Sequence, residues 1–85
     1  MNPIKDLQIF PGVGKSIAQD LVDLGIIAVS DLKSQNPETL YEQLCVLRGQ
    51  HIDRCMLYVF RCAVYFASED QHDPYLLKWW HWKDK

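Results

Sequence analysis

The sequence predicts an all-α fold, a compact domain of five to six helices. No segment alternates between apolar and polar residues with the period of a strand, whereas apolar residues recur at helical spacing along most of the chain. Helix start and stop signals separate these stretches, among them Gly25, Asn36-Pro37 and Asp73-Pro74. The chain of 85 residues has the size of one domain, and its hydrophobic fraction of 48% is enough for a small core.

Two short helices joined by a tight turn are predicted at the start of the chain. Residues 3–9 form the first helix and residues 14–24 the second, which ends at Gly25 in a left-handed cap. Apolar side chains recur at helical spacing in both helices, and Val13 can point inward between them. These side chains are Ile4, Leu7 and Phe10 before the turn and Ile17, Ala18, Leu21 and Leu24 after it.

The turn Pro11-Gly12-Val13-Gly14-Lys15-Ser16 has the composition of an anion-binding loop. Pro11 cannot continue the first helix, and glycines can take positive φ and let an anion approach the backbone closely. The second helix begins with N–H groups that have no partner inside the helix, and its positive end favours an anion. We therefore predict that the turn binds a phosphate of a nucleic-acid backbone. The predicted contacts are the backbone amides of Gly12, Val13 and Gly14, the charge of Lys15 and the hydroxyl of Ser16.

The segment Phe10-Pro11-Gly12-Val13-Gly14-Lys15, followed by Ile17-Ala18 and Leu21, resembles the helix-hairpin-helix motif of sequence-independent DNA-binding proteins. The resemblance implies a SAM-like helical fold and binding to the shape of the DNA backbone rather than to base edges. Two alternatives remain open. Gly14-Lys15-Ser16 is also the end of a P-loop, although that motif needs a glycine at Ile9 and a preceding strand. The other is a hairpin that only turns the chain and binds nothing.

The middle of the chain contains two more predicted helices. Ser30 is expected to cap a short helix over residues 31–33. Asn36-Pro37 predicts the start of the next helix, with Asn as the cap and Pro in the first turn. This helix includes Leu47 and is broken at residues 48–51.

The longest predicted helix, residues 52–67, is apolar nearly all round, so we expect it at the centre of the core. Arg61 lies in the middle of this helix and has two interpretations. Its stem can lie on apolar surface while the guanidinium reaches water or a carboxylate, or the guanidinium can contact a phosphate.

Asp73 is predicted to cap a last helix that begins at Pro74 and contains Trp79, Trp80 and Trp82. Three Trp side chains in four positions cannot all face one core, so at least one is exposed or covered by a partner. We predict that this helix packs on its own domain or across a homodimer. Stacking of a Trp on an unpaired base is the alternative.

A faint internal repeat aligns Leu7-x-x-Phe10-Pro11-Gly12 with Leu44-x-x-Leu47-Arg48-Gly49. It places Ala18 on Cys55 and predicts a second, degenerate helix-hairpin-helix unit in which Arg48, Gly49 and Gln50 form a weaker phosphate contact. Residues 1–68 are then a tandem helix-hairpin-helix-like domain, and residues 69–85 are the Trp-rich helix. Chance similarity between two amphipathic helix pairs explains the repeat nearly as well.

The whole chain resembles a family of small bacterial proteins known as the pathogenicity locus, or mitomycin-resistance-like, family. The resemblance implies the helical fold and a bacterial cytoplasmic setting rather than any activity. The matching segments are residues 10–18, Asp31-Leu32, Asp53-Arg54-Cys55, Tyr58-x-Phe60-Arg61-Cys62-Ala63 and Leu77-Lys78-Trp79-Trp80-x-Trp82-Lys83.

The charge balance limits how tightly the chain can bind nucleic acid. A net charge of −2 disfavours a high-affinity binder, which is usually basic. One hairpin that contacts one or two phosphates gives an affinity on the order of 10⁻⁴ M or weaker. Neither a signal peptide nor an apolar run long enough to span a membrane is expected.

The cysteines suggest packing in the core rather than metal binding. An odd number of cysteines without framework spacing fits reduced thiols and a cytoplasmic location. A metal site would have to use Cys45, His51, Cys55 and Cys62. However, Cys55 and Cys62 lie about 10 Å apart along one helix, too far to share one zinc. We expect core packing, no metal and no cofactor.

The predicted function is non-enzymatic, non-sequence-specific DNA binding through the Gly12-Val13-Gly14 hairpin. No nucleophile has a base fixed by a third group, so an enzyme is not expected. The alternative is a helical protein-interaction module, a homodimer or an adaptor that docks through Trp79, Trp80 and Trp82 and binds no nucleic acid.

Overall fold

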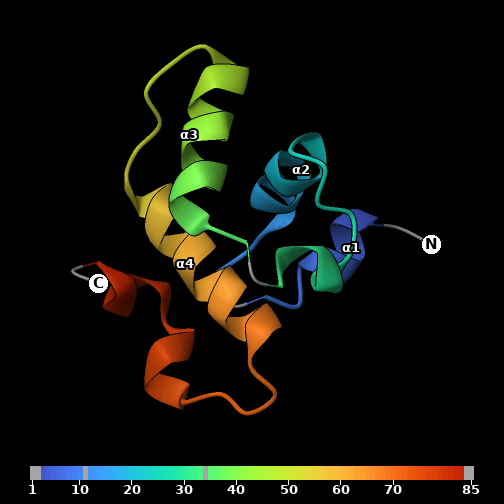
Figure 1. Cartoon of the computed structure of the whole chain (residues 1–85), viewed down its shortest axis with the longest axis vertical. Coiled ribbons are helices and arrows are strands. Elements are labelled where there is room, and N and C mark those ends of the chain that lie inside the picture. The colour runs from blue at the N-terminus through green and yellow to red at the C-terminus, as the bar shows by residue number, and fades with distance from the viewer. Residues whose placement is uncertain (1–2, 11, 34, 84–85) are drawn as a thin grey trace.

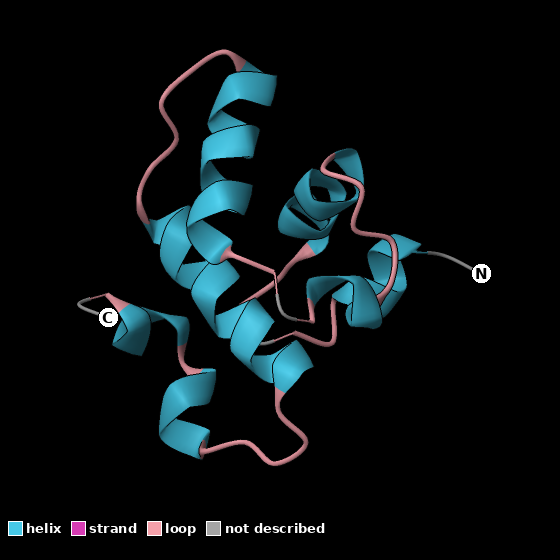
Figure 2. Cartoon of the chain, in the orientation of Figure 1, coloured by secondary structure: helices cyan, strands magenta, loops and turns pink. Residues whose placement is uncertain are grey.

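The computed structural model describes residues 3–10, 12–33 and 35–83, and this part of the chain is all-helical, as predicted (Figures 1 and 2). It contains four α-helices and three 3₁₀-helices, and no strand within the described residues. In chain order they are α1 (Pro3–Leu7), α2 (Lys15–Asp23), η1 (Val29–Leu32), α3 (Pro37–Arg48), α4 (Cys55–Ser68), η2 (Pro74–Leu77) and η3 (Trp79–Trp82). Pro11 lies outside the described residues, as do the side chains of Pro3 and Ile4.

Helix α4 lies at the centre of the molecule, as its apolar sequence predicts. It packs against α3, η1, η2 and η3, and Phe60, Cys62 and Ala63 are fully buried on it. Helices α1 and α2 pack against each other on the other side of the core (Figure 1). The buried apolar core consists of Leu7, Phe10, Val13, Ala18, Leu21, Ile26, Leu32, Leu40, Tyr41, Leu44, Leu57, Val59, Phe60 and Ala63.

Local cap chemistry fixes several helix ends where it was predicted. Gly25 follows α2 with φ +93°, and the next amide, of Ile26, donates to the Leu21 carbonyl. The Asn36 side chain accepts hydrogen bonds from the amides of Glu38 and Thr39 at the start of α3.

Other boundaries differ from the prediction. Helix α1 ends at Leu7 rather than at Ile9. The cap of η1 is not Ser30, because η1 begins at Val29 and the Asp31 carboxylate accepts from the amides of Ile27 and Ala28.

The start of α4 and the structure of residues 74–82 also differ from the prediction. Helix α4 begins at Cys55 rather than at Ile52. The Asp53 carboxylate, just before the helix, accepts a hydrogen bond from the Cys55 amide. The predicted last helix is two 3₁₀-helices, η2 and η3, although Asp73 does cap the first of them through the Tyr75 amide. The chain therefore has four α-helices in its described part instead of the predicted five to six helices.

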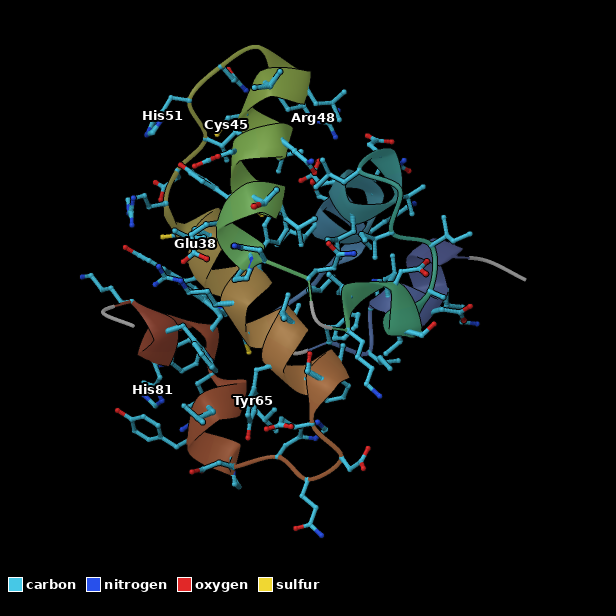
Figure 3. All side chains as sticks on the ribbon, in the orientation of Figure 1. Glu38, Cys45, Arg48, His51, Tyr65 and His81 are labelled. Carbon is cyan, nitrogen blue, oxygen red and sulfur yellow. The ribbon has the colours of Figure 1, made fainter. Side chains whose placement is uncertain are left out.

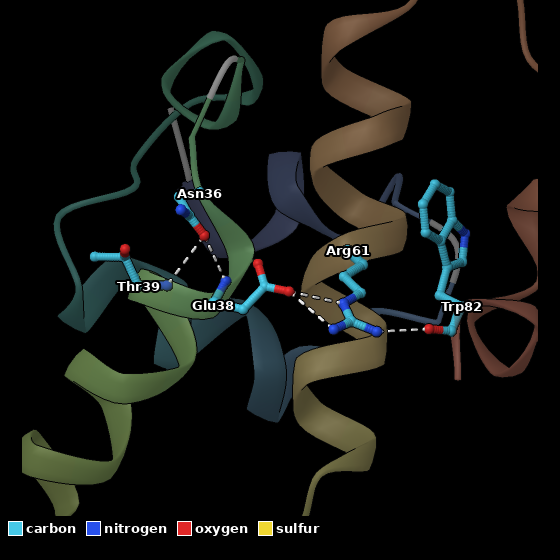
Figure 4. Close-up of polar contacts among 5 residues, drawn as sticks. All are labelled: Asn36, Glu38, Thr39, Arg61 and Trp82. Carbon is cyan, nitrogen blue, oxygen red and sulfur yellow. Dashed lines mark hydrogen bonds and ion pairs between the residues drawn. The ribbon is translucent and has the colours of Figure 1, made fainter. Parts of the chain in front are cut away.

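Arg61 joins three elements of the fold (Figure 4). Its guanidinium lies 2.8 Å from the Glu38 carboxylate on α3 and donates at 2.9 Å to the Trp82 carbonyl of η3. Its side chain is only 11% exposed. The prediction that the Arg61 guanidinium reaches a carboxylate is confirmed. Its bond to the Trp82 carbonyl also holds η3 against α4.

The described helices include none that is both long and apolar enough to cross a membrane.

Candidate nucleic-acid interface

The hairpin between α1 and α2 is closed by backbone hydrogen bonds and buried side chains. The Phe10 amide donates to the Leu7 carbonyl at 3.3 Å, and the Val13 amide to the Phe10 carbonyl at 3.2 Å. The side chains of Phe10 and Val13 are buried in the core, as the apolar pattern predicts. Gly12 has φ +79°, in the region that favours glycine.

The N-terminus of α2 faces solvent with an open approach. Gly14 is the N-cap and offers no side chain to the helix amides. The first intrahelical bond joins the Ala18 amide to the Gly14 carbonyl, so the amides of Lys15, Ser16 and Ile17 have no partner within the helix. A Cβ atom placed at Gly14 has nothing within 4 Å, and Lys15 and Ser16 are exposed. This end of α2 therefore presents amides and a positive charge together.

The structure places the other two predicted hairpin residues differently. The Val13 amide is already bonded to Phe10, so it is not available to an anion. Gly12 lies against the Trp79 ring, since a Cβ atom there would be 2.7 Å from Trp79 Cδ1. The Val13 amide is thus removed from the predicted contacts, whereas Gly12 is exposed beside the Trp79 ring and stays, with Gly14, Lys15 and Ser16, a predicted contact.

The second predicted contact region, Arg48, Gly49 and Gln50, is occupied by internal interactions. Arg48 Nη2 lies 2.6 Å from Asp20 Oδ1 and 2.7 Å from Asp23 Oδ2, both on α2. Figure 3 shows Arg48 at the end of α3 on the side that faces α2. Gly49 has φ +68° and ends α3, while the Gln50 amide donates to the Cys45 carbonyl. These ion pairs compete with a phosphate for Arg48, and the second phosphate contact stays a prediction.

The start of α4 is also unsuited to an anion. The Asp53 carboxylate accepts the Cys55 amide at 2.9 Å, which places a negative charge at this helix N-terminus. The internal repeat is matched in burial only in part: Leu7 and Leu44 are both buried, whereas Phe10 is buried and the aligned Leu47 is 50% exposed. Ala18 is likewise buried whereas the aligned Cys55 is exposed.

The carboxylates that accept these hydrogen bonds have lowered pKa values. Bonding to Arg48 lowers the pKa of Asp23, bonding to Arg61 lowers that of Glu38, and the Cys55 amide lowers that of Asp53. A group whose pKa is lower in the folded chain stabilises the fold above its unfolded value and loses that contribution as the pH falls through its folded value.

We therefore expect a thermal midpoint that is level above about pH 5 and falls below about pH 4. Circular dichroism melts across this range measure the effect. Asp23→Asn should flatten the acid slope, whereas Asp70→Asn, at an exposed position with no ion pair in the described structure, should leave it unchanged. A midpoint that rises on acidification would contradict the assignment.

The cysteines lie in three different environments. Cys62 is buried, and burial raises the pKa of its thiol to about 11. Cys45 is half-buried and Cys55 is exposed, so the prediction that all three pack in the core is wrong for Cys55. Among the residues that the structure describes, no three His, Cys, Asp or Glu side chains form a group that could hold a metal ion.

Comparison with known proteins identifies the family. A model of the family described as "Pathogenicity locus" matches residues 1–85. The chain belongs to the pathogenicity locus family. It is also 32% identical over 77 residues to the "Mitomycin resistance protein McrB" of Streptomyces lavendulae, an alignment that covers 91% of this chain and 70% of that protein. The resemblance to this family is confirmed, and no solved structure matches the chain.

Sequence reasoning missed the two contacts that limit the interface, Trp79 on Gly12 and Arg48 on α2. Both join residues far apart in the chain, and no local pattern marks them. The contact of Asp53 with the start of α4 had a signal, because an acidic residue near the start of an apolar helix favours the positive end of that helix.

Proposed function

We propose that this chain binds the DNA backbone, without base specificity, at the N-terminus of α2. In this proposal α1, the turn and α2 act as a helix-hairpin-helix unit within a SAM-like arrangement. The observation that supports it is the open end of α2, where Gly14 has no side chain and Lys15 and Ser16 are exposed. Amides at a helix N-terminus next to a lysine suit a phosphodiester oxygen.

The charges on the chain set the expected strength. A single lysine beside the amides neutralises about one phosphate, so log K should fall with log[salt] at a slope of about −1. The net charge of −2 adds no general attraction to DNA. Binding should therefore be weak and confined to low salt. A contact with the backbone alone should also be insensitive to base sequence.

The sharpest test is Gly14→Asp, which places a carboxylate of the chain itself at the proposed phosphate site. Gly14 has φ −92° and ψ −172°, an extended conformation open to any residue, so the variant should fold. Its carboxylate should accept hydrogen bonds from the amides that have no partner within α2 and stabilise the helix by a few tenths of a kcal/mol. The same carboxylate should repel a phosphate and weaken DNA binding by about tenfold. Fluorescence anisotropy with a labelled duplex at low salt measures the affinity, and a thermal melt measures stability.

Matched variants separate the effect of the added negative charge from the effect of occupying the α2 amides. Gly14→Asn occupies the same amides without a charge and should have an intermediate effect. Lys15→Gln should reduce the salt slope by about one, whereas Lys33→Gln, at an exposed position outside the hairpin, should not. The proposal is wrong if the wild-type chain binds no DNA, or if Gly14→Asp binds as well as wild type.

Binding to another protein chain is a second candidate function. Tyr75 and Trp80 are 59% and 52% exposed on the C-terminal segment, and Val46 is 81% exposed on α3. Large apolar side chains that remain outside the core are typical of protein interaction surfaces.

A further inference from the structure

We propose that the groove between α2 and α3 binds the C-terminal segment, residues 74–83, of a second copy of this chain. The two copies would associate head to tail. The proposal rests on the second candidate function and is independent of DNA binding.

The groove has apolar walls and an open mouth. Its volume is about 520 Å³, and its apolar lining comes from Leu24 on the α2 side and from Val46 and Leu47 on α3. Val46 is 81% exposed and Leu47 is 50% exposed, so these side chains cost free energy in water unless something covers them.

The polar rim of the groove is acidic. Asp23, Glu42 and Gln43 complete its lining. Arg48 is already shared between Asp20 and Asp23, so its charge offsets only one of these two carboxylates. Glu42 is exposed and has no ion pair in the described structure. An occupant should therefore combine an apolar side chain with positive charge.

The C-terminal segment has this combination. Trp80 and Tyr75 are exposed, Lys78 and Lys83 are exposed beside them, and residues 74–83 contain no acidic side chain. The segment thus presents two aromatic rings and two ammonium groups on one short stretch.

The segment is also held in a fixed shape, so little conformational entropy is lost on binding. Trp82 Nε1 donates to the Leu76 carbonyl at 2.8 Å, and Arg61 donates to the Trp82 carbonyl. The Tyr75 and His81 rings stack with their centroids 3.7 Å apart. Figure 3 shows His81 at the outer side of this segment.

A chain cannot fill its own groove. The C-terminal segment lies beside α4 at the end of the molecule opposite to the C-terminal half of α3 (Figure 1). The occupant must come from a second copy, and the interface then joins two different surfaces, which is a heterologous contact.

Sedimentation velocity on the full-length chain at low salt tests this proposal. The wild type should self-associate in a concentration-dependent and salt-sensitive manner. Glu42→Lys should weaken self-association by about tenfold through the groove, and Lys78→Glu by a similar factor through the segment. Lys33→Glu, an exposed charge reversal on neither surface, serves as the matched control and should associate as wild type.

Mixing distinguishes a head-to-tail contact from a symmetric dimer. The chain with Glu42→Lys keeps an intact segment, and the chain with Trp80→Ala keeps an intact groove. At a concentration just sufficient for the wild type to associate, neither should associate alone, but an equimolar mixture should form a one-to-one heterodimer through the one intact pair of surfaces. Combining Glu42→Lys and Lys78→Glu in one chain should restore self-association by exchanging the charges.

Three results would overturn the proposal: a monomeric wild type, a dimer lost with Trp80→Ala but kept with Glu42→Lys, or a mixture that stays monomeric. Gly14→Asp, which blocks the proposed DNA site, should associate as wild type. Failure of self-association is therefore distinguishable from failure of DNA binding, because sedimentation and DNA titration measure the two separately and different variants affect them.

Discussion

Gly12→Ala is expected to lower the free energy of unfolding by about 2 kcal/mol or more. Gly12 has φ +79°, and a side chain in this left-handed region costs about 1–2 kcal/mol. The added Cβ would also lie 2.7 Å from Trp79 Cδ1, closer than non-bonded carbon atoms approach. The ring must move away from the hairpin, and its contact with the core weakens. Urea unfolding followed by circular dichroism measures the loss.

Two further variants separate the backbone cost from the contact with Trp79. Gly14→Ala is the matched control, because Gly14 has φ −92° and its Cβ would meet nothing within 4 Å. Because alanine is a poorer N-cap than glycine, it should lower the free energy of unfolding by no more than about 1 kcal/mol, less than Gly12→Ala does. In the Trp79→Ala background, Gly12→Ala should cost only the backbone term, so the double-mutant cycle should show a coupling of at least about 0.5 kcal/mol. A cycle without coupling would show that Trp79 does not press on the hairpin.

The parts of the fold set by short-range chemistry could be predicted from the sequence. Asn36 and Gly25 fix helix ends through hydrogen bonds to residues a few positions away, so their effects are visible in the sequence. The buried apolar face of α4 follows in the same way from composition and periodicity. The end of the chain was less predictable. Its three Trp residues favour a helix by pattern, whereas hydrogen bonds and ring contacts to α4 and η2 hold two short 3₁₀-helices instead.

The candidate site was only partly predictable, because its limits depend on long-range contacts. The open α2 terminus follows from the Gly12-Val13-Gly14 pattern. The pairing of Arg48 depends on two carboxylates on α2, far away in the chain. Asp20 and Asp23 are three positions apart, so a helix places them on one face, but nothing in the sequence says which cation meets them.

Arg61→Met is expected to lower the free energy of unfolding by about 1–3 kcal/mol and to loosen the C-terminal segment. Methionine keeps the apolar stem but removes the bonds to Glu38 and to the Trp82 carbonyl. Without them the Trp82 carbonyl loses its donor, and η3 keeps its ring packing and the bond from the Trp82 indole to Leu76 but loses its hydrogen bond to α4 through Arg61. Hydrogen exchange should therefore rise most in residues 74–83, and tryptophan fluorescence should shift to longer wavelength.

Glu38→Gln separates the ion pair from the bond to the segment. Glu38 is 50% exposed, so solvent screens its charge and the ion pair contributes about 1 kcal/mol or less. The glutamine can still accept a hydrogen bond from Arg61, and the Trp82 carbonyl keeps its donor. We expect a small stability loss, a flatter acid slope because the lowered pKa of Glu38 is gone, and unchanged exchange in residues 74–83. If Glu38→Gln loosens the segment as much as Arg61→Met does, the ion pair rather than the bond to Trp82 holds it.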